Sequence, residues 1–427
     1  MEESTSTVKT TRPHTGALSG MTVLDMTRVL AGPTCTQILG DLGADILKIE
    51  RPIHGDDSRA MGPPYADAHA DNPQESAYFI SVNRNKRSLA LNLTQPQGQA
   101  IARQLMAKSD IVVENFRKGV TERWQLDYST ACRHHPHIIY CSLSGFGRTG
   151  PYADRGGYDF LIQAMGGLMS ITGDVHGTPM KASGGLIDVL TGLYASTAIL
   201  AALHHRQRTG QGQHIDMALF DTQIAYLGYI AQSYLMSKEM PQRYGNSHPT
   251  IVPYQLFHAQ DEPIILAIGS DLQFQRFCHY AQCDALAQDK RFATNATRVQ
   301  HRQELIGQLQ HIIKQHNAQY WCEGLTQCHV PCSHIRAIPD VLKDPQAQAR
   351  HMVRHMPYQP SGHAKQETLP FIASPMTMEK TPIQYRHPPP RCGEQSNAIL
   401  KEYLGMTDKD ITRLIEDGIV SSPSQKR

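Results

Sequence analysis

Asp188 is the residue whose type and setting most strongly suggest chemistry, because it interrupts an apolar stretch over residues 184–203. A carboxylate in such a stretch is rarely buried unless it is paired or used. Gly184 and Gly185 predict a loop that enters a helix, which places Asp188 in the first helical turn, where unpaired N–H groups and the helix dipole favour an anion. We expect this setting to keep the carboxylate ionised and usable as a nucleophile. The structural alternative is that Asp188 only caps a buried helix.

Five short apolar segments, which alternate with helical patterns, predict the strands that would position this residue. They are residues 22–26, 44–49, 88–93, 110–114 and 137–143. The alternation indicates an α/β fold with a doubly wound (Rossmann-like) parallel sheet, in which the carboxyl ends of the strands surround the ligand crevice. Arg51 follows the second strand, and Arg117, Lys118 and Arg123 follow the fourth. Together these cations suit a polyphosphate ligand, although each one taken alone is more typical of a solvated surface charge.

The pattern divides the chain into a large and a smaller domain. A hairpin pattern over residues 254–268 and apolar residues at helical spacing from Leu305 to Ile313 mark the smaller one. The predicted parts are a disordered tail over 1–17, a large α/β domain over 18–235, a small α+β domain over 250–340, and a Pro-rich return with C-terminal helices over 345–427 that packs on the large domain.

Composition disfavours several classes of protein. The net charge is +2 without a long basic run, so no nucleic-acid partner is expected. The nine cysteines are odd in number and widely spaced, which fits free thiols in a reducing compartment. Residues 1–18 have no apolar core, so they do not form a secretory signal. We therefore expect a cytoplasmic protein. Residues 186–203 come nearest to a membrane span, but Asp188 and several hydroxyl residues break them, so we expect no membrane partner. The cysteines and histidines over residues 322–334 lack paired zinc-ligand spacing, so no metal is expected.

Residues 145–150 match the dinucleotide fingerprint G-x-G-x-x-G after a predicted strand. Pro151 stands where the helix should begin, and no strand ending in an acid follows about 20 residues later, so an NAD-dependent dehydrogenase is disfavoured. A glycine turn at the end of a strand still suits ligand contacts, which keeps Gly145 as a candidate. No G-x-x-x-x-G-K-[ST] segment is present, so the sequence does not indicate ATP-driven chemistry.

Taken together and in order, several segments resemble the family III CoA transferases of the CaiB/BaiF type. The resemblance covers about residues 18–420 and rests on residues 23–33, 41–51, 85–88, 113–116, 144–147, 158–159, 188 and 210–216. It implies an interlaced homodimer and no permanently bound cofactor, with acyl-CoA and a small carboxylic acid as substrates. The family's nucleophilic aspartate falls on Asp188, which would form an aspartyl anhydride and then an aspartyl-CoA thioester. The implied CoA contacts are Ala31, Arg51, Leu91, Asn92, Leu93, Asn115, Phe116, Arg117, Arg123 and Tyr158.

Within the family, the chain is most similar to members that act on dicarboxylates with succinyl-CoA as donor. Residues 245–254 carry much of this closer likeness, and Asn246 and His248 are candidates for contacting the far carboxylate of the acceptor. Leu30 stands where oxalate-specific members carry glutamine, which disfavours formyl-CoA:oxalate transfer. The backbone at Gly145 is a candidate donor to the oxyanion that forms during acyl transfer.

Two rival functions remain open. A 2-methylacyl-CoA racemase shares the fold and uses a histidine in a Gly-His-Asp motif, whereas this chain has Gly157-Tyr158-Asp159. Because tyrosine has an unperturbed pKa of about 10, it is a poor base at neutral pH, which favours transfer over racemisation. A non-catalytic acyl-CoA-binding protein would not need a carboxylate at position 188.

Overall fold

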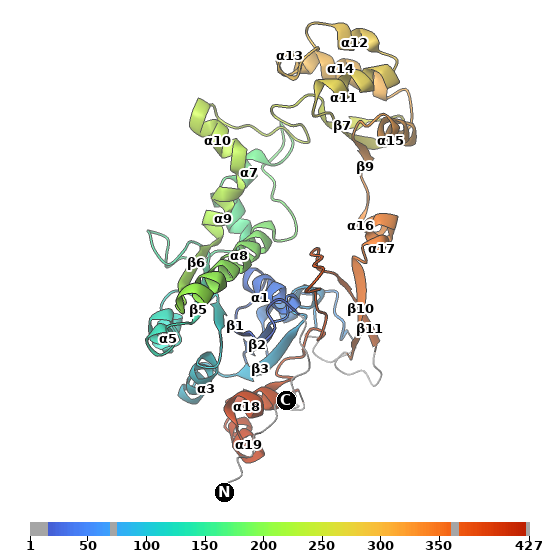
Figure 1. Cartoon of the computed structure of the whole chain (residues 1–427). Helices are drawn as coiled ribbons and strands as arrows, with labels where there is room; N and C mark the ends of the chain where they lie inside the picture. The colour runs from blue at the N-terminus through green and yellow to red at the C-terminus, as the bar shows by residue number, and fades with distance from the viewer. Residues whose placement is uncertain (1–15, 69–74, 360–366, 424–427) are drawn as a thin grey trace. The chain divides into compact units, whose positions relative to one another are not determined.

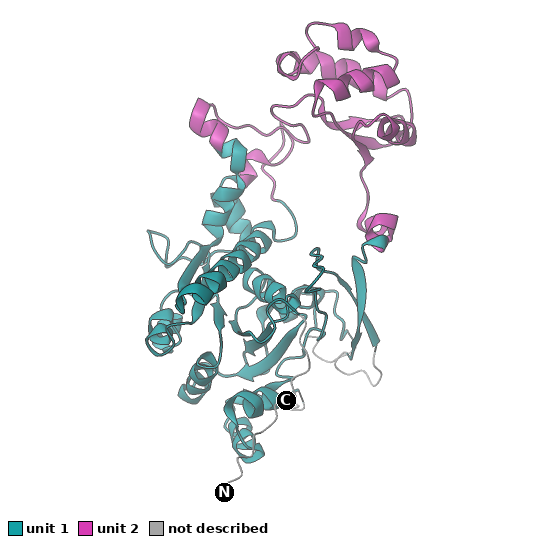
Figure 2. Ribbon diagram, viewed as in Figure 1, with its two compact units in different colours: residues 1–167, 182–231, 349–427 teal, residues 168–181, 232–348 magenta. Residues whose placement is uncertain are grey.

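The computed structural model describes residues 16–68, 75–359 and 367–423. The chain forms two compact units, coloured separately in Figure 2. Unit 1 consists of Met1–Gly167, Ala182–Ala231 and Ala349–Arg427, and unit 2 consists of Leu168–Lys181 and Gln232–Gln348. The sequence places all of residues 18–235 in one domain and does not predict that Leu168–Lys181 belongs to unit 2. The predicted tail over 1–17 lies outside the described residues, except for Gly16 and Ala17.

Unit 1 is built on a seven-stranded sheet with the order β12-β3-β2-β1-β4-β5-β6. The strands are β1 (Thr22–Met26), β2 (Asp45–Glu50), β3 (Lys86–Leu91), β4 (Ile111–Glu114), β5 (Ile139–Ser144), β6 (His214–Ala218) and β12 (Val420–Ser421). The first six are parallel, and β12 runs antiparallel to β3. This confirms the predicted α/β parallel sheet, whose strand order reverses between β1 and β4. Strands β6 and β12 are not among the predicted strands.

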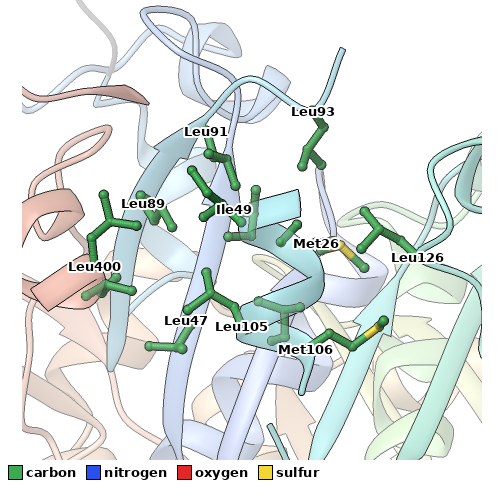
Figure 3. Close-up of a cluster of buried hydrophobic side chains, with 14 of the residues drawn as sticks. Met26, Leu47, Ile49, Leu89, Leu91, Leu93, Leu105, Met106, Leu126 and Leu400 are labelled. Atoms are coloured by element: carbon green, nitrogen blue, oxygen red, sulfur yellow. The ribbon is translucent and has the colours of Figure 1, made fainter. Parts of the chain in front are cut away.

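Helices cover both faces of this sheet, because its strands are apolar on both sides. One face packs against α1 (Ala31–Asp41) and α8 (Leu186–Thr209), which lie beside each other in Figure 1. The other face packs against α3 (Pro96–Met106), α18 (Ser396–Leu404) and α19 (Asp408–Glu416). Figure 3 shows this second core, where Leu105 of α3 and Leu400 of α18 lie near Leu47 and Leu89 of the sheet.

The Pro-rich return begins with an antiparallel hairpin of β10 (Val353–Tyr358) and β11 (Glu367–Ile372), which the sequence analysis missed. The chain then runs without helix or strand to α18, hydrogen-bonded to the large unit. The Gln384 N–H donates to Asp41 O at 3.0 Å, and the Asn85 N–H donates to His387 O at 2.8 Å. The remaining short helices of unit 1 are η1 (Asp57–Ala60), α2 (Ala77–Ser81), α4 (Val120–Arg123), α5 (Tyr128–His134), α6 (Asp159–Met165) and α9 (Leu219–Tyr226). Helix α10 (Gly228–Ser237) begins in unit 1 and ends in unit 2.

Unit 2 has its own core around a three-stranded antiparallel sheet of β7 (Tyr254–His258), β8 (Pro263–Ala267) and β9 (Cys332–His334). The β7–β8 hairpin was predicted, and Leu305, Leu309 and Ile313 are buried as their spacing predicts. The helices are α7 (Leu168–Ile171), α11 (Asp271–Tyr280), α12 (Asp284–Gln288), α13 (Asn295–Gln300), α14 (Arg302–Ile313), α15 (Ala318–Gln327) and α16 (Ile338–Lys343), followed by α17 (Pro345–Ala349) at the border with unit 1.

Helix α8 matters for the site because it carries Asp188 and packs closely on α1. Among the described residues it is the one helix long and apolar enough to cross a membrane, yet it buries Ile187, Ala195 and Ile199 against α1 and the sheet. The close approach depends on Gly192. A Cβ atom at Gly192 would lie 2.7 Å from Ala31 O. The two helices therefore touch through backbone at this point, which fixes the start of α1 beside the start of α8.

Replacement Gly192→Ala should destabilise unit 1. The added methyl group must displace the α1 backbone, and this overpacking outweighs the better helix propensity of alanine, for a net loss of about 1–2 kcal/mol. Denaturant unfolding followed by circular dichroism measures the change. Gly307→Ala in the exposed part of α14 is the matched control, because a Cβ there meets no atom within 4 Å; it should stabilise unit 2 by about 0.5–1 kcal/mol. A Gly192→Ala protein as stable as the wild type would contradict this packing.

Candidate active site

A cavity of about 200 Å³ opens at the carboxyl edge of the parallel sheet in unit 1, where β1 and β4 meet and the strand order reverses. Ligands bind at such switch points in open α/β sheets. Segments that follow β1, β4 and β5 line the cavity, together with the start of α8. The lining residues are Arg28, Val29, Leu30, Ala31, Asp57, Asn115, Phe116, Arg117, Lys118, Leu143, Ser144, Gly145, Ala153, Asp154, Arg155, Gly156, Gly157, Tyr158, Asp188 and Leu219.

Asp188 lies in the first turn of α8, as the sequence predicts. The chain reaches this turn through Gly184 and Gly185, whose φ angles are +80° and +63°. Glycine adopts this left-handed backbone without a Cβ penalty. A Cβ at Gly185 would also lie 2.4 Å from Leu30 Cδ2, so Leu30 packs directly on the loop that delivers Asp188.

The N-cap position of α8 is Gly185, and the side chain that accepts from the first N–H groups of the helix is Asp159, not Asp188. Asp159 Oδ2 accepts hydrogen bonds from the backbone N–H groups of Ile187 at 2.7 Å and of Asp188 at 3.4 Å. Gln163 Nε2 donates to the other oxygen of Asp159 at 2.6 Å and so holds the cap in place. Within the part of the chain that the structure describes, the carboxylate of Asp188 accepts no hydrogen bond. Its oxygens are therefore available to a substrate, and the purely structural interpretation of Asp188 as a cap is wrong.

The charge state of Asp188 also differs from the expectation. Burial, and then the negative charge of Asp159, raise the pKa of Asp188 to about 7. The sequence predicts that the helix terminus keeps this carboxylate ionised, but Asp159 occupies the N–H groups that would do so. A carboxylate with a pKa near neutrality is more basic than an ordinary one and is still substantially ionised at neutral pH. Both properties favour a nucleophile.

Tyr78, on α2, belongs to the surroundings of Asp188 although the sequence gives no sign of it. Burial, followed by the charges of Asp188 and Asp159, raises the pKa of Tyr78 to about 12. The phenol therefore stays protonated as a potential hydrogen-bond donor near the two carboxylates.

The cavity carries more cationic than anionic side chains. Arg28 pairs with Asp57 at 3.2 Å, and Arg51, outside the lining, pairs with the same carboxylate. Arg117 and Lys118 are exposed and form no ion pair among the described residues. These two side chains are thus available to an anionic ligand. Arg28 could have been anticipated, because it follows β1 as Arg117 follows β4.

The turn after β5 places Tyr158 and Asp159 at the cavity through a contact between glycines. A Cβ at Gly145 would lie 2.7 Å from Gly157 Cα, so neither position tolerates a side chain without backbone movement. No helix begins after residue 150 until α6 at Asp159, unlike a dinucleotide-binding turn. The match at residues 145–150 therefore lacks the helix that a dinucleotide site needs, and Gly145 is its one residue in the cavity lining.

The structure brings some of the predicted site residues together and leaves others apart. Those that line the cavity are Ala31, Asn115, Phe116, Arg117, Gly145, Tyr158 and Asp188. Leu91 and Leu93 are core residues (Figure 3), and Asn92 Oδ1 accepts from the Thr94 hydroxyl at 2.6 Å. Arg123 is exposed on α4 outside the lining. Asn246 and His248 belong to unit 2.

Comparison with known proteins agrees with this geometry. The model of CoA-transferase family III matches residues 18–396. Succinate–glutarate CoA-transferase of Agrobacterium fabrum is 42% identical over 390 residues, 90% of this chain and 95% of that protein. Acetyl-CoA:oxalate CoA-transferase of Acetobacter aceti is 38% identical over 339 residues, 79% of this chain and 85% of that protein. The crystal structure of a CAIB/BAIF family protein from Brucella suis superposes with a TM-score of 0.79 at 40% identity, over 91% of this chain and 100% of that one. The chain therefore belongs to CoA-transferase family III.

Proposed function

We propose that this enzyme moves CoA from succinyl-CoA to a second dicarboxylic acid, with Asp188 as the covalent carrier. The observation that carries the proposal is a carboxylate without hydrogen-bond partners among the described residues, whose pKa is raised to about 7, in a cavity flanked by available cations. The names of the relatives support the same chemistry, since both denote transfer of CoA between carboxylic acids.

The proposed cycle uses only the carboxylate and the two acids. An oxygen of Asp188 attacks the thioester carbon of succinyl-CoA, the C–S bond breaks, and CoA thiolate leaves a mixed anhydride. The thiolate attacks the aspartyl carbonyl of this anhydride, which releases succinate and forms the Asp188–CoA thioester. The acceptor carboxylate attacks that thioester and again displaces thiolate. Attack of the thiolate on the acceptor's acyl carbon yields the new acyl-CoA and regenerates Asp188.

The cavity suits the reacting end of the thioester rather than the whole of CoA. Its volume of about 200 Å³ falls below the usual size of a pocket for a complete drug-sized ligand. The nucleotide would therefore lie outside it, and Arg117 and Lys118 supply charge for the phosphates next to Phe116. The other implied CoA contacts, at Ala31, Arg51, Leu91–Leu93, Asn115, Arg123 and Tyr158, remain predictions.

A longer dicarboxylate than oxalate is the acceptor that we propose. Leu30 lines the cavity and contributes an apolar side chain to it. An acceptor with methylene groups between its carboxylates can place them against this surface. The relatives act on both glutarate and oxalate, so the identities alone do not decide the acceptor. Asn246 and His248 remain the candidates for the far carboxylate.

The racemase alternative depends on a base at position 158. Tyr158 lines the cavity and is 74% exposed, at the position where the racemases carry a histidine. Exchange of the α-proton of a branched acyl-CoA with deuterated solvent would favour racemisation instead.

We further propose a cytoplasmic, interlaced homodimer. All nine cysteines are free thiols, as suits a reducing compartment. Large apolar side chains are exposed on three helices of unit 1, more than a monomer usually leaves open. They are Phe160, Leu161 and Met165 on α6, Leu193, Tyr194 and Leu200 on α8, and Ile224 and Tyr226 on α9. Sedimentation equilibrium should give twice the chain mass of 47.6 kDa, whereas a mass of one chain would contradict the dimer.

Covalent trapping tests the carrier. Incubation with succinyl-CoA followed by hydroxylamine should leave a hydroxamate on Asp188 in the peptide mass spectrum. Asp188→Asn should form no adduct and should lose transfer by at least about 10⁴-fold, because the nucleophile is gone. Asp154→Asn is the matched control, since Asp154 also lines the cavity, and it should still give the adduct on Asp188. Measurable transfer of CoA by a protein whose Asp188 peptide stays unmodified would contradict the covalent mechanism.

The pH dependence of kcat/KM tests the raised pKa. Only the ionised carboxylate attacks, so the rate should rise with pH and level off above the pKa of about 7. Asp159→Asn removes a neighbouring negative charge that raises this pKa, so the inflection should move to lower pH. Because an asparagine oxygen can still accept the two N–H groups, the α8 cap is retained. An inflection that does not move would contradict the electrostatic role of Asp159.

A further inference from the structure

The turn between β1 and α1 holds an unusual backbone conformation beside the nucleophile. Val29 has a φ angle of +70°, in the left-handed region that a β-branched residue strongly disfavours. Such conformations persist only where the surroundings impose them, and they concentrate at functional sites. Val29 and its neighbours Arg28, Leu30 and Ala31 all line the Asp188 cavity.

Two side chains hold this turn from opposite sides. Asn115 Oδ1 accepts from the Arg28 N–H at 3.0 Å, while Asn115 Nδ2 donates to Arg28 O at 2.8 Å. Asp56 Oδ1 accepts from the Val29 N–H at 3.0 Å. The side chains of Asn115 and Asp56 therefore bind the backbone on both sides of the Arg28–Val29 peptide.

Asp56 is itself fixed by a buried ion pair. Lys48 Nζ lies 2.9 Å from Asp56 Oδ2, and both side chains are fully buried. Lys48 Nζ also donates to Thr27 O at 2.9 Å, so one ammonium group holds Asp56 and the start of the turn. The Ser58 N–H and hydroxyl donate to Asp56 Oδ1 as well. A buried ion pair is a poor source of stability, which leaves the fixing of geometry as its better explanation here.

The same turn packs on the loop that delivers the nucleophile. Leu30 Cδ2 occupies the space where a Cβ at Gly185 would lie, three residues before Asp188. A relaxed Val29 would move Leu30 and Ala31 against this loop, because they are the next two residues of the chain. Small displacements of positioning groups cost a reaction much of its rate.

We propose that the side chains of Asn115 and Asp56 form a clamp, in which the ion pair with Lys48 fixes Asp56. This clamp holds Val29 in the left-handed conformation. It thereby positions Leu30 and Ala31 against Asp188. Asp56 and Lys48 do not line the cavity and are positioning residues. The inference rests on the proposed transfer of CoA at Asp188. It assigns to Asn115 a structural use of both amide atoms, beyond the CoA contact expected from the resemblance.

The test compares two replacements of the ion pair. The two double variants are Lys48→Met/Asp56→Asn and Lys48→Met/Asp56→Leu. Each removes both charges of the Lys48–Asp56 pair. Asparagine keeps an oxygen that can accept from the Val29 N–H, whereas leucine does not. Each is made with Val29 and with Val29→Gly, because glycine adopts a positive φ without the clamp. With Val29, kcat should fall about tenfold or more from the asparagine to the leucine variant, with a smaller change in KM. In the Val29→Gly background that drop should shrink to less than about threefold.

Asp41→Asn is the control, because it breaks a different buried ion pair, with Arg84 at 2.5 Å. Its effect on kcat should be the same with valine or glycine at position 29. If the leucine variant does not fold, Asn115→Ala is the variant that tests the clamp. It removes the Asn115 half of the clamp and leaves no buried charge without its partner. Adding Val29→Gly should again reduce the loss of kcat.

The clamp would be overturned if kcat fell equally with valine and with glycine at position 29. This outcome counts when the variants fold and the wild type transfers CoA. A wild type that transfers no CoA would overturn the proposed function instead.

Discussion

The backbone contact between α1 and α8 is the constraint on which the rest of the site depends. Gly192 lets Ala31 O approach α8 so closely that no side chain could stand between them. This contact brings the beginnings of the two helices to the same edge of the sheet, where the strand order reverses between β1 and β4. Asp188 thus lies at the start of one helix, and the turn that lines its cavity lies at the start of the other.

Chemistry follows from how the start of α8 is shared between two carboxylates. Asp159 takes the N–H groups and is stabilised by them, whereas Asp188 receives none and is left near a negative charge. Asp159 accepts the hydrogen bonds of the helix start, so Asp188 is left without them and is the more basic for it. The helix start, which normally stabilises an anion, therefore leaves Asp188 with a raised pKa, as the proposed nucleophile requires. The turn that leads to Asp188 uses two glycines because both positions have a positive φ, and a Cβ at Gly185 would also meet Leu30.

Local patterns in the sequence predict the frame of the site well. Gly184 and Gly185 place Asp188 in a first helical turn, and five of the parallel strands follow from short apolar segments. The charge state of Asp188 could not be predicted, because it depends on Asp159, which is 29 residues away in the chain. Strand β12 has only two residues and forms no pattern of its own, because pairing with β3 alone defines it. Leu91 and Leu93 are buried in the core, and their expected contact with CoA stays a prediction, since an apolar residue at a strand end suits either use.

Direct titration of the Asp188 carboxyl group measures whether burial and Asp159 raise its pKa. Carbon-13 NMR of protein labelled at the aspartate carboxyl carbons, with Asp188→Asn to assign the signal, follows this one group through pH 3 to 9. The account predicts a midpoint near the pKa of about 7, well above that of an ordinary aspartate. A midpoint near 4, as about 3.9 is usual for aspartate, would contradict it, because Asp188 would then be an ordinary ionised carboxylate with no influence from burial or from Asp159.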